Sequence, residues 1–285
     1  MREADIQTFW QTHPCGQRLV EEQFRDDYET FFRSYDAMRY AKEAHILECL
    51  DAIHFKNKSV LEIGIGQGSD SEQLIRRGAN WSGLDITEEA VQRVTSRLTA
   101  RKLAFNELKV GSVLDMDFPD KSFDLVFSHG VLHHVPDIVK AQSEIWRVLK
   151  PDGELVVMVY AKWSFNYLVA IALIRRALLL LCYGANIAPS ALVQKHIDNA
   201  RRIGLLRYLR MENFIHANTD GPENPFSRVY DRRLLNEHFP DFNLSKVYKR
   251  FMHAPPLPIE WLPLEKLLGW HLWAHFKPRQ SYGAL

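Results

Sequence analysis

Between residues 58 and 160, short apolar runs alternate with longer stretches in which apolar residues recur every three or four positions. The short runs predict buried strands, and the longer stretches predict helices with one apolar face. This succession is typical of βαβ units around a mostly parallel sheet. The expected strands are 59–64, 81–86, 108–112, 123–128 and 154–160, and the expected helices are 69–78, 87–102 and 137–149.

The alternation is absent on either side of this region. Residues 4–55 have the apolar spacing of helices that pack one face on a neighbour, and residues 161–216 are also helical in pattern. A loop rich in glycine and proline follows at 218–228. A helix is then expected at 231–239, and two late strands, 243–253 and 269–278, predict an antiparallel hairpin at the sheet edge.

These patterns predict an α/β fold with a doubly wound, Rossmann-like sheet of seven strands, mostly parallel and ending in the antiparallel hairpin. This fold divides the chain into four expected segments. We expect an N-terminal helical cap at 1–55, a ligand-binding core at 56–160, a helical insertion that serves as a substrate lid at 161–235, and strands that complete the sheet at 236–285.

The most apolar stretch, residues 167–185, has Arg175 and Arg176 at its middle. A membrane-spanning helix needs about 20 predominantly apolar residues, and charges at its centre are unfavourable. The pattern favours a buried or interfacial helix over a transmembrane span, and a peripheral membrane contact stays open.

Charge and cysteine content exclude several classes. With 36 basic and 35 acidic residues the net charge is +1, whereas a protein that holds nucleic acid usually has a clear basic excess. The three cysteines form no C-x-x-C pair, which disfavours zinc and disulfides, and the first residues do not resemble a secretory signal. We therefore expect a cytoplasmic protein without a metal site; a homodimer stays open.

The sequence VLEIGIGQGSD, residues 60–70, places Gly64, Gly66 and Gly68 directly after an expected strand. Glycines at such a turn let backbone N–H groups approach a ligand. The spacing differs from the dinucleotide pattern G-x-G-x-x-G, and the carboxylates of Glu62 and Asp70 would repel a pyrophosphate. A ligand with a cationic part suits this turn better.

A second acid, Asp85, stands 21 residues beyond Gly64 at the end of the next expected strand. In doubly wound folds an acid at this position hydrogen-bonds ribose hydroxyls. A ligand with a ribose and a positive charge, but no diphosphate, matches S-adenosylmethionine.

Together with Asp85, three segments carry a family resemblance: VLEIGIGQGSD, GSVLDMDFPDKSFDLVFSHGVLHHVPD and EIWRVLKPDGELVV. Residues 55–160 resemble the class I S-adenosylmethionine-dependent methyltransferases, in the small-molecule branch that includes the ubiquinone and menaquinone C-methyltransferases. The resemblance implies that Glu62, Gly64 and Gly66 face the amino-acid part of the cofactor, that Asp85 holds the ribose and that Ile86 packs on adenine.

Where this family often has an aspartate that reaches the adenine amino group, the chain has Ser112; Val113 or Asp115 stands as an alternative contact. The resemblance also implies that His129 lies near the methionine moiety and that Arg39 either meets its carboxylate or is a surface charge. The complete set of expected cofactor-binding residues is Arg39, Glu62, Gly64, Ile65, Gly66, Gly68, Asp85, Ile86, Ser112, Val113 and His129.

The sequence HGVLHH offers three histidines. A neutral histidine suits proton removal near pH 7, so His129 and His133 are candidates for a general base, whereas His134 is expected to be a packing residue. No cysteine or Glu-x-x-His partner accompanies them, which disfavours a metal. Cys15 is not expected to be a nucleophile, because no base is matched to it.

We expect methyl transfer by in-line displacement to a small lipophilic acceptor of quinone, prenyl, polyketide or lipid type. Alternatives are a non-catalytic cofactor-binding regulator and an enzyme dependent on NAD or a nucleotide sugar. Four tryptophans, at 163, 261, 270 and 273, are equally compatible with the core and with an apolar substrate cavity.

Overall fold

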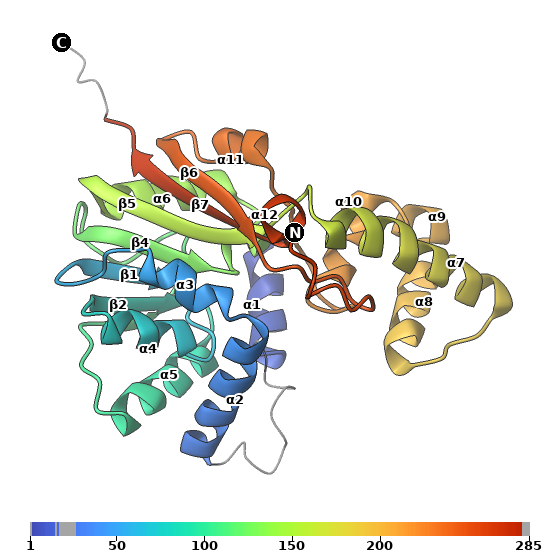
Figure 1. Ribbon diagram of the computed structural model, residues 1–285, viewed down its shortest axis with the longest axis horizontal. Helices are drawn as coiled ribbons and strands as arrows, with labels where there is room; N and C mark the ends of the chain where they lie inside the picture. Colours follow the sequence, from blue (N-terminus) through green and yellow to red (C-terminus); the bar gives the residue numbers. More distant parts are fainter. Residues whose placement is uncertain (1, 15, 17–26, 281–285) are drawn as a thin grey trace.

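The computed structural model describes residues 2–14, 16 and 27–280 (Figure 1). Seven strands form one sheet in the order β3-β2-β1-β4-β5-β7-β6. The first five strands are parallel, while β7 runs antiparallel to β5 and β6. The expected fold class is confirmed. The strands are β1 Ser59–Ile63, β2 Asn80–Asp85, β3 Leu108–Val110, β4 Phe123–His129, β5 Leu149–Tyr160, β6 Phe242–Arg250 and β7 His271–Pro278.

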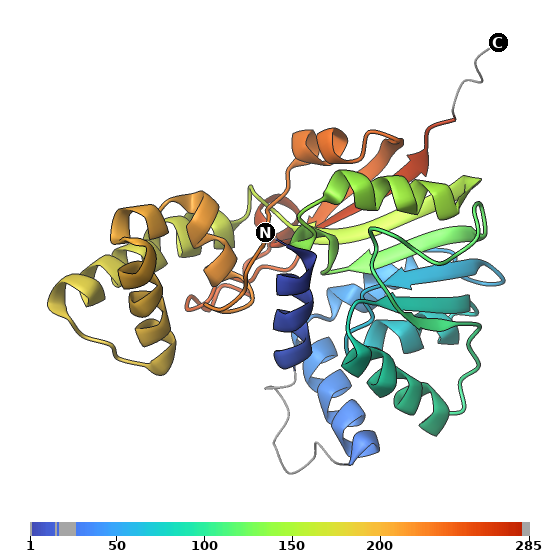
Figure 2. The ribbon, with the colours of Figure 1, turned by 180° about the vertical axis from the view of Figure 1, so that it is seen from behind.

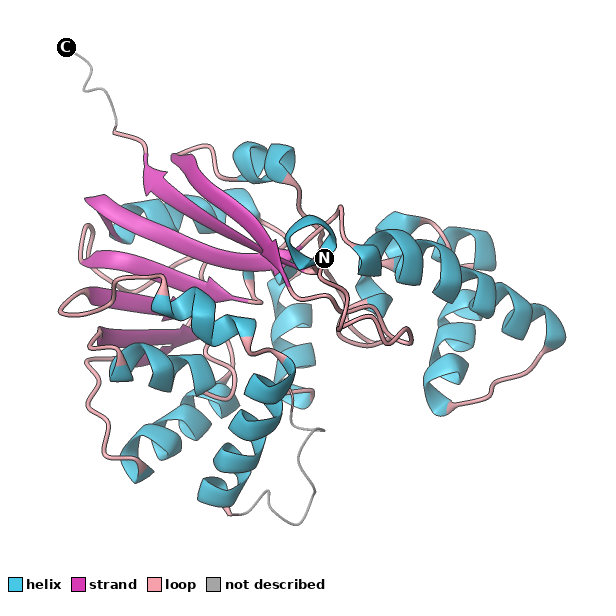
Figure 3. Ribbon diagram, in the orientation of Figure 1, coloured by secondary structure: helices cyan, strands magenta, loops and turns pink. Residues whose placement is uncertain are grey.

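Helices cover both faces of this sheet (Figure 3). Two apolar clusters fill the space between layers, one including Ile145 of α6 and Leu235 of α11, the other including Leu50 of α3 and Val94 of α5. The helices around the sheet are α1 Glu3–Thr12, α2 Tyr28–Lys42, α3 His45–Asp51, α4 Ser69–Arg76, α5 Glu88–Ala100, α6 Ile138–Val148, α11 Arg232–His238 and α12 Glu265–Leu268. Short 3₁₀ turns lie at η3 Leu132–His134 and η5 His216–Asn218.

Local sequence explains where α5 begins. The Thr87 side chain accepts a hydrogen bond from the Ala90 amide, and Glu88 and Glu89 occupy the first turn. A side-chain acceptor at the N-cap satisfies an otherwise unpaired amide, and acidic residues are favourable beside the positive end of a helix. The end of β2 and the start of α5 are thereby fixed next to each other.

Residues 150–153, which lie between the expected helix 137–149 and the expected strand 154–160, do not form a separate turn. These residues are part of β5, which pairs with β4 from Leu149 onward through a register shift between Phe123 and Leu125. Lys150 also donates to the Asp124 carboxylate on β4 at 2.6 Å. Pairing with the neighbouring strand therefore overrides the local turn preference of proline and glycine.

Residues 166–215, which we name the helical lobe, project away from the sheet (Figures 1 and 2). The lobe has its own apolar cluster, which includes Ile171, Ile197 and Phe214. Its helices are the π-helical η4 Asn166–Arg175, followed by α7 Arg176–Ala185, α8 Ala191–Ile203, α9 Leu205–Tyr208 and α10 Met211–Phe214.

The continuous helix Asn166–Ala185 is long and apolar enough to cross a membrane by length and composition, yet only 17% of its 18-residue apolar window is buried. It is therefore not the buried core helix that the sequence allowed.

Candidate active site

A cavity of about 510 Å³ opens where β1, β2 and β4 end. In open α/β sheets this edge is where ligands bind, and the volume is within the range of small-molecule sites. Of the expected residues, eight line the cavity: Arg39, Gly64, Ile65, Gly66, Asp85, Ile86, Val113 and His129. Four others do not line it: Glu62, Gly68, Ser112 and His133.

The glycine turn forms one wall. Gly64 and Gly66 have φ angles of +77° and +52°, and Gly68, at +76°, is the N-cap of α4. A Cβ on Gly64 would lie 2.2 Å from Val131, whereas a Cβ on Gly66 would meet nothing within 4 Å. Gly64 is thus required by the positive φ and by close packing, and Gly66 leaves backbone open to the cavity.

Asp85 fixes this turn from the end of β2. One carboxylate oxygen accepts from the Ile65 amide at 3.0 Å and the Gly66 amide at 3.5 Å. The other accepts from the Thr87 amide at 2.9 Å and its hydroxyl at 2.8 Å. Burial raises the pKa of Asp85 against the opposing effect of these hydrogen bonds.

The cavity wall between α2 and α4 carries a buried group of three charged or ionisable side chains. The Arg39 guanidinium donates to Asp70 at 2.7 Å and lies 3.0 Å from His129 Nδ1, which is 3.1 Å from the same carboxylate oxygen. Burial acts to raise the pKa of Asp70, but Arg39 and His129 outweigh it and keep that pKa well below its usual range. Asp70 is therefore ionised, and its Oδ1 has no hydrogen-bond partner among the described residues.

Glu62 lies behind this wall. Its carboxylate accepts from the Trp81 indole N–H at 2.8 Å, and the residue is 1% exposed. Burial and the neighbouring Asp70 raise the pKa of Glu62 to about 8. Glu62 is thus a buried acid that is largely protonated at pH 7, beside the cavity instead of on its surface.

Helix α1 forms the wall near the end of β3. The Ser112 hydroxyl donates to the Glu3 carboxylate and accepts from the Leu114 amide at 2.9 Å, so Ser112 is engaged within the protein. Glu3 itself lines the cavity, and the side-chain Nε2 of Gln7 donates to the Ile86 carbonyl at 2.8 Å. A carboxylate from α1 therefore stands near the position where the resemblance expects an acid after the third strand.

Another part of the cavity lining is aromatic and lies beside η3, of whose two histidines only His134 lines the cavity. His133 is fully buried, its ring centroid is 3.9 Å from that of Tyr160, and neither of its nitrogens has a partner among the described residues. Burial and the adjacent His134 lower the pKa of His133 well below its usual value, so its ring is neutral. Trp10, His134, Tyr160 and Asp220 line this part.

The ligand atoms of His133, His134 and Asp220 lie within 4.8 Å of one another. His134 Nδ1 is 2.7 Å from the Phe226 carbonyl, and its Nε2 is 3.3 Å from Asp220 Oδ2. A carbonyl accepts, so Nδ1 is the donor to Phe226, whereas Nε2 makes no hydrogen bond with the described residues. His134 is thus buried at the end of η3 and contacts the 218–228 loop through Phe226 and Asp220.

Sequence reasoning did not include Glu3, Asp220 or Tyr160 among the site residues. The pair formed by Ser112 and Glu3 spans 109 positions, and His134 and Asp220 come from different segments, so no local pattern indicates either contact. None of the four tryptophans lines the cavity: Trp270 and Trp273 are buried, whereas Trp163 and Trp261 are exposed. Cys15 lies outside the described residues.

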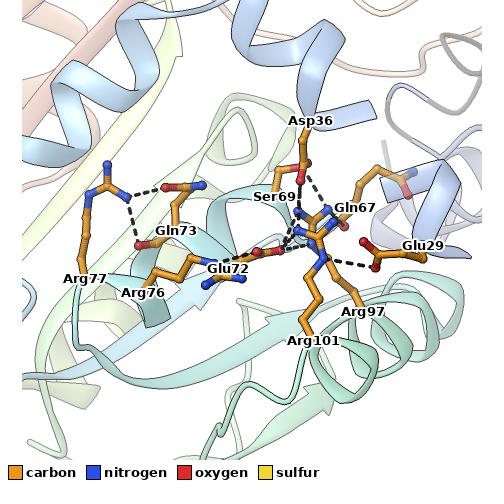
Figure 4. A network of polar contacts seen from close by, with 10 residues as sticks. All are labelled: Glu29, Asp36, Gln67, Ser69, Glu72, Gln73, Arg76, Arg77, Arg97 and Arg101. Atoms are coloured by element: carbon orange, nitrogen blue, oxygen red, sulfur yellow. Dashed lines mark hydrogen bonds and ion pairs between the residues drawn. The ribbon is translucent and has the colours of Figure 1, made fainter. Parts of the chain in front are cut away.

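A buried charge network positions α2, the helix that carries Arg39 (Figure 4). Arg97 of α5 bonds to Asp36 of α2 and, at 2.9 Å, to Glu72 of α4. Arg101 joins the same Glu72 at 2.5 Å. Because Arg97 and Glu72 are almost fully buried, this network fixes three helices to one another at the cavity wall.

The site fits S-adenosylmethionine better than a dinucleotide. Asp70 lines the cavity, is ionised and has an unpartnered Oδ1, which suits a cationic group, and the open face of Gly66 leaves room in the same cavity. The same carboxylate would repel a diphosphate.

Comparison with known proteins points the same way. A family profile described as a methyltransferase domain matches residues 61–157. A ubiquinone biosynthesis O-methyltransferase from Alkalilimnicola ehrlichii is 31% identical over 131 residues, 45% of this chain and 51% of that enzyme. A sterol 24-C-methyltransferase from Yarrowia lipolytica is 38% identical over 96 residues, 33% of this chain and 25% of that enzyme. The chain thus spans about a quarter to a half of the length of these curated relatives.

The fold is similar to that of an S-adenosylmethionine-dependent methyltransferase from Mesorhizobium loti, with a TM-score of 0.53 at 15% identity, covering 82% of this chain and 97% of that one. At this identity the likeness concerns the fold alone. The family profile covers the glycine turn, Asp85 and the η3 histidines, which the sequence also singled out. Over residues 61–157 the chain is therefore a methyltransferase domain of the class I S-adenosylmethionine-dependent type.

Proposed function

We propose that this protein transfers a methyl group from S-adenosylmethionine to a small lipophilic acceptor. The observation that carries the proposal is one cavity with two unlike parts. Ionised Asp70 and the glycine turn line one part, and Trp10, Tyr160 and His134 line another. Cofactor and acceptor can therefore meet within a single enclosure, as in-line transfer requires.

When bound, the cofactor supplies an electrophilic methyl on a sulfonium. The chain's own residues then have three tasks. Asp70 offers an acceptor for the cofactor's ammonium, while Arg39 is the cation within reach of its carboxylate. Asp85 holds the glycine turn and lies at the position for the ribose. Apolar side chains at the acceptor end exclude water, which favours transfer because charge on sulfur is dispersed.

At the adenine end we infer that Glu3 takes the part that an aspartate at position 112 plays in this family. Ser112 is occupied by Glu3, and the Glu3 carboxylate reaches the cavity from α1. Ile86 and Val113 supply apolar walls beside it. A carboxylate is the natural acceptor for an exocyclic amino group.

For proton removal we keep His129 and His133 as candidate bases; His129 lines the cavity, whereas His133 is buried behind its lining. His133 is neutral and its two nitrogens have no partner among the described residues, whereas the Nδ1 of His129 already contacts Arg39 and Asp70. A neutral imidazole can accept a proton from a hydroxyl or an activated carbon of the acceptor.

Support for a lipophilic acceptor comes from the aromatic end of the cavity and from relatives whose names include ubiquinone and sterol. These names cover oxygen and carbon acceptors, so the acceptor atom is left open. The matches give no support to a non-catalytic regulator or to an NAD-dependent enzyme. A cytoplasmic location, a homodimer and a peripheral membrane contact stay predictions, as do the four segment boundaries.

The direct test is a thermal-shift and calorimetric screen with S-adenosylmethionine, S-adenosylhomocysteine and NAD, followed by mass spectrometry of products from quinol, sterol and prenyl-phenol acceptors. We expect stabilisation by the first two ligands, none by NAD, and a product heavier by one methylene. Stabilisation by NAD alone would overturn the proposal. Binding without any product would favour the regulator.

A further inference from the structure

The outer surface of the helical lobe is unusually apolar. Seven large apolar side chains of this segment are exposed, among them Leu181 at 69% and Leu206 at 82%. On the helix Asn166–Ala185, Leu173, Ala177 and Leu181 are each four residues apart and all exposed, so they form one continuous stripe. The full set is Leu173, Leu178, Leu180, Leu181, Ile187, Leu192 and Leu206. Contiguous exposed apolar surface of this kind marks a contact with another phase or partner.

The same lobe is strongly basic. Residues 166–215 contain seven arginines and lysines against two acids, a net charge of +5, so the rest of the chain, with +1 overall, carries −4. Arg207 and Arg210 are exposed and have no ion-pair partner among the described residues. Basic side chains beside exposed leucines match an anionic lipid surface, where each lysine or arginine adds attraction.

Arg175, one of the two arginines at the middle of the apolar helix, does not interrupt this surface. Arg175 turns inward, donating to the Pro255 carbonyl at 2.7 Å and to the Asn218 carbonyl at 2.7 Å. The first contact ties the lobe to the proline-rich segment that carries Trp261, which is 77% exposed. An exposed indole beside such a surface suits the membrane interface, where amphipathic rings are favoured.

Two other occupants fit less well. A second copy of the lobe would bring two surfaces of charge +5 together, which is repulsive. A transmembrane span would place α8 beyond the bilayer, yet Ile197 of α8 belongs to the same apolar cluster as Ile171 and Leu179 of the long helix. The helix is thus held flat within the lobe, exposing one face.

We propose that the helical lobe docks on an anionic phospholipid bilayer, with the leucine stripe in the interface and the arginines on the headgroups. This docking goes beyond the methyl transfer and does not depend on it. It would bring the cavity, one wall of which is Asp220 on the loop that follows the lobe, close to membrane-dissolved molecules.

The test uses the full chain in flotation assays with vesicles of phosphatidylcholine alone or mixed with phosphatidylglycerol. We expect binding to the anionic vesicles, weakened as salt rises from about 0.1 M to about 0.5 M. The double variant Leu173→Glu/Leu181→Glu should lose about tenfold or more in partitioning, and Arg207→Glu/Arg210→Glu a comparable amount. The matched control is Val110→Glu/Val139→Glu, the same kind of change at half-exposed sites outside the lobe, which should bind like the parent.

Melting temperature and the shift caused by S-adenosylmethionine are measured for every variant, so loss of folding or of cofactor binding is separated from loss of docking. The proposal is overturned if the parent does not float with anionic vesicles, or if lobe and control variants bind alike. It is also overturned if light scattering shows a dimer that the leucine variant dissociates while lipid binding is unchanged.

Discussion

Arg97 and Arg207 are both helical arginines, but their surroundings have nothing in common. Arg97 is fully buried against Asp36 and Glu72 at the cofactor end of the cavity, whereas Arg207 faces solvent in the helical lobe. A buried charge must be paired in a defined geometry, while an exposed charge imposes little on its neighbours. The cofactor end is therefore fixed by the protein's internal contacts, and the lobe has a surface shaped for something outside it.

The largest expected effect is on stability. Arg97→Met removes one partner from the buried network and leaves Glu72 and Asp36 less compensated, which should lower the free energy of unfolding by about 3–5 kcal/mol. Arg207→Met in the lobe should change it by less than about 0.5 kcal/mol. Urea denaturation of both variants measures the difference. If both variants lost the same free energy of unfolding, the buried network would not stabilise the protein more than the exposed lobe arginine does.

The next effect concerns cofactor affinity. Asp70→Asn keeps the shape of the side chain but removes the charge that faces the cavity beside Arg39, so binding of S-adenosylmethionine should weaken about 10- to 100-fold. Asp117→Asn, at a side chain that is 98% exposed, is the matched control and should bind like the parent. Calorimetric titration gives both constants. Unchanged affinity in Asp70→Asn would remove this carboxylate from the site.

A smaller effect is the pH dependence due to Glu62. Its pKa is raised to about 8, so the stability that it contributes is complete below about pH 4.5 and is lost as pH rises through 8. A nearby cation favours the ionised form, so affinity for S-adenosylmethionine should increase as pH rises toward 8 and level off above it, by about tenfold in total for each unit by which binding lowers that pKa. Titrations in buffers of different ionisation enthalpy should reveal proton release.

Glu62→Gln provides the control for this profile, since it removes the titrating group but preserves the acceptor for the Trp81 indole. The variant should show a flatter dependence of affinity on pH. A parent profile as flat as that of the variant would contradict the assignment of the proton to Glu62.

The smallest expected effect lies where the N-terminal helix meets the cavity. Glu3→Gln retains a hydrogen-bond acceptor but removes the charge, so affinity should fall about three- to tenfold. The affinity for S-adenosylhomocysteine should fall by a similar factor, because this ligand and S-adenosylmethionine share the adenine. Glu88→Gln, an exposed acid at the start of α5, is a matched control. If Glu3→Gln bound S-adenosylmethionine as tightly as the parent, Glu3 would not contact the adenine, and Val113 or Asp115 would be the candidates for that contact.

Sequence patterns predicted the parts of the site that depend on local order. Gly64 and Gly66 follow a strand directly, and Asp85 ends the next one, so topology alone brings them to one edge. Glu3 and Ser112 meet across 109 positions, and their contact depends on how α1 packs. The spacing of apolar residues also could not show that the apolar face of Asn166–Ala185 is exposed, because buried and exposed leucines recur at the same intervals.

Asp85 has a thermodynamic consequence beyond its position. Because it accepts from the Ile65 and Gly66 amides, the protein's own hydrogen bonds define the shape of the glycine turn. The conformational entropy of that turn is lost during folding and is not lost again when a ligand arrives. Association should then be limited by diffusion into the cavity and not by loop ordering, so mutations at this wall should act mainly on the dissociation rate.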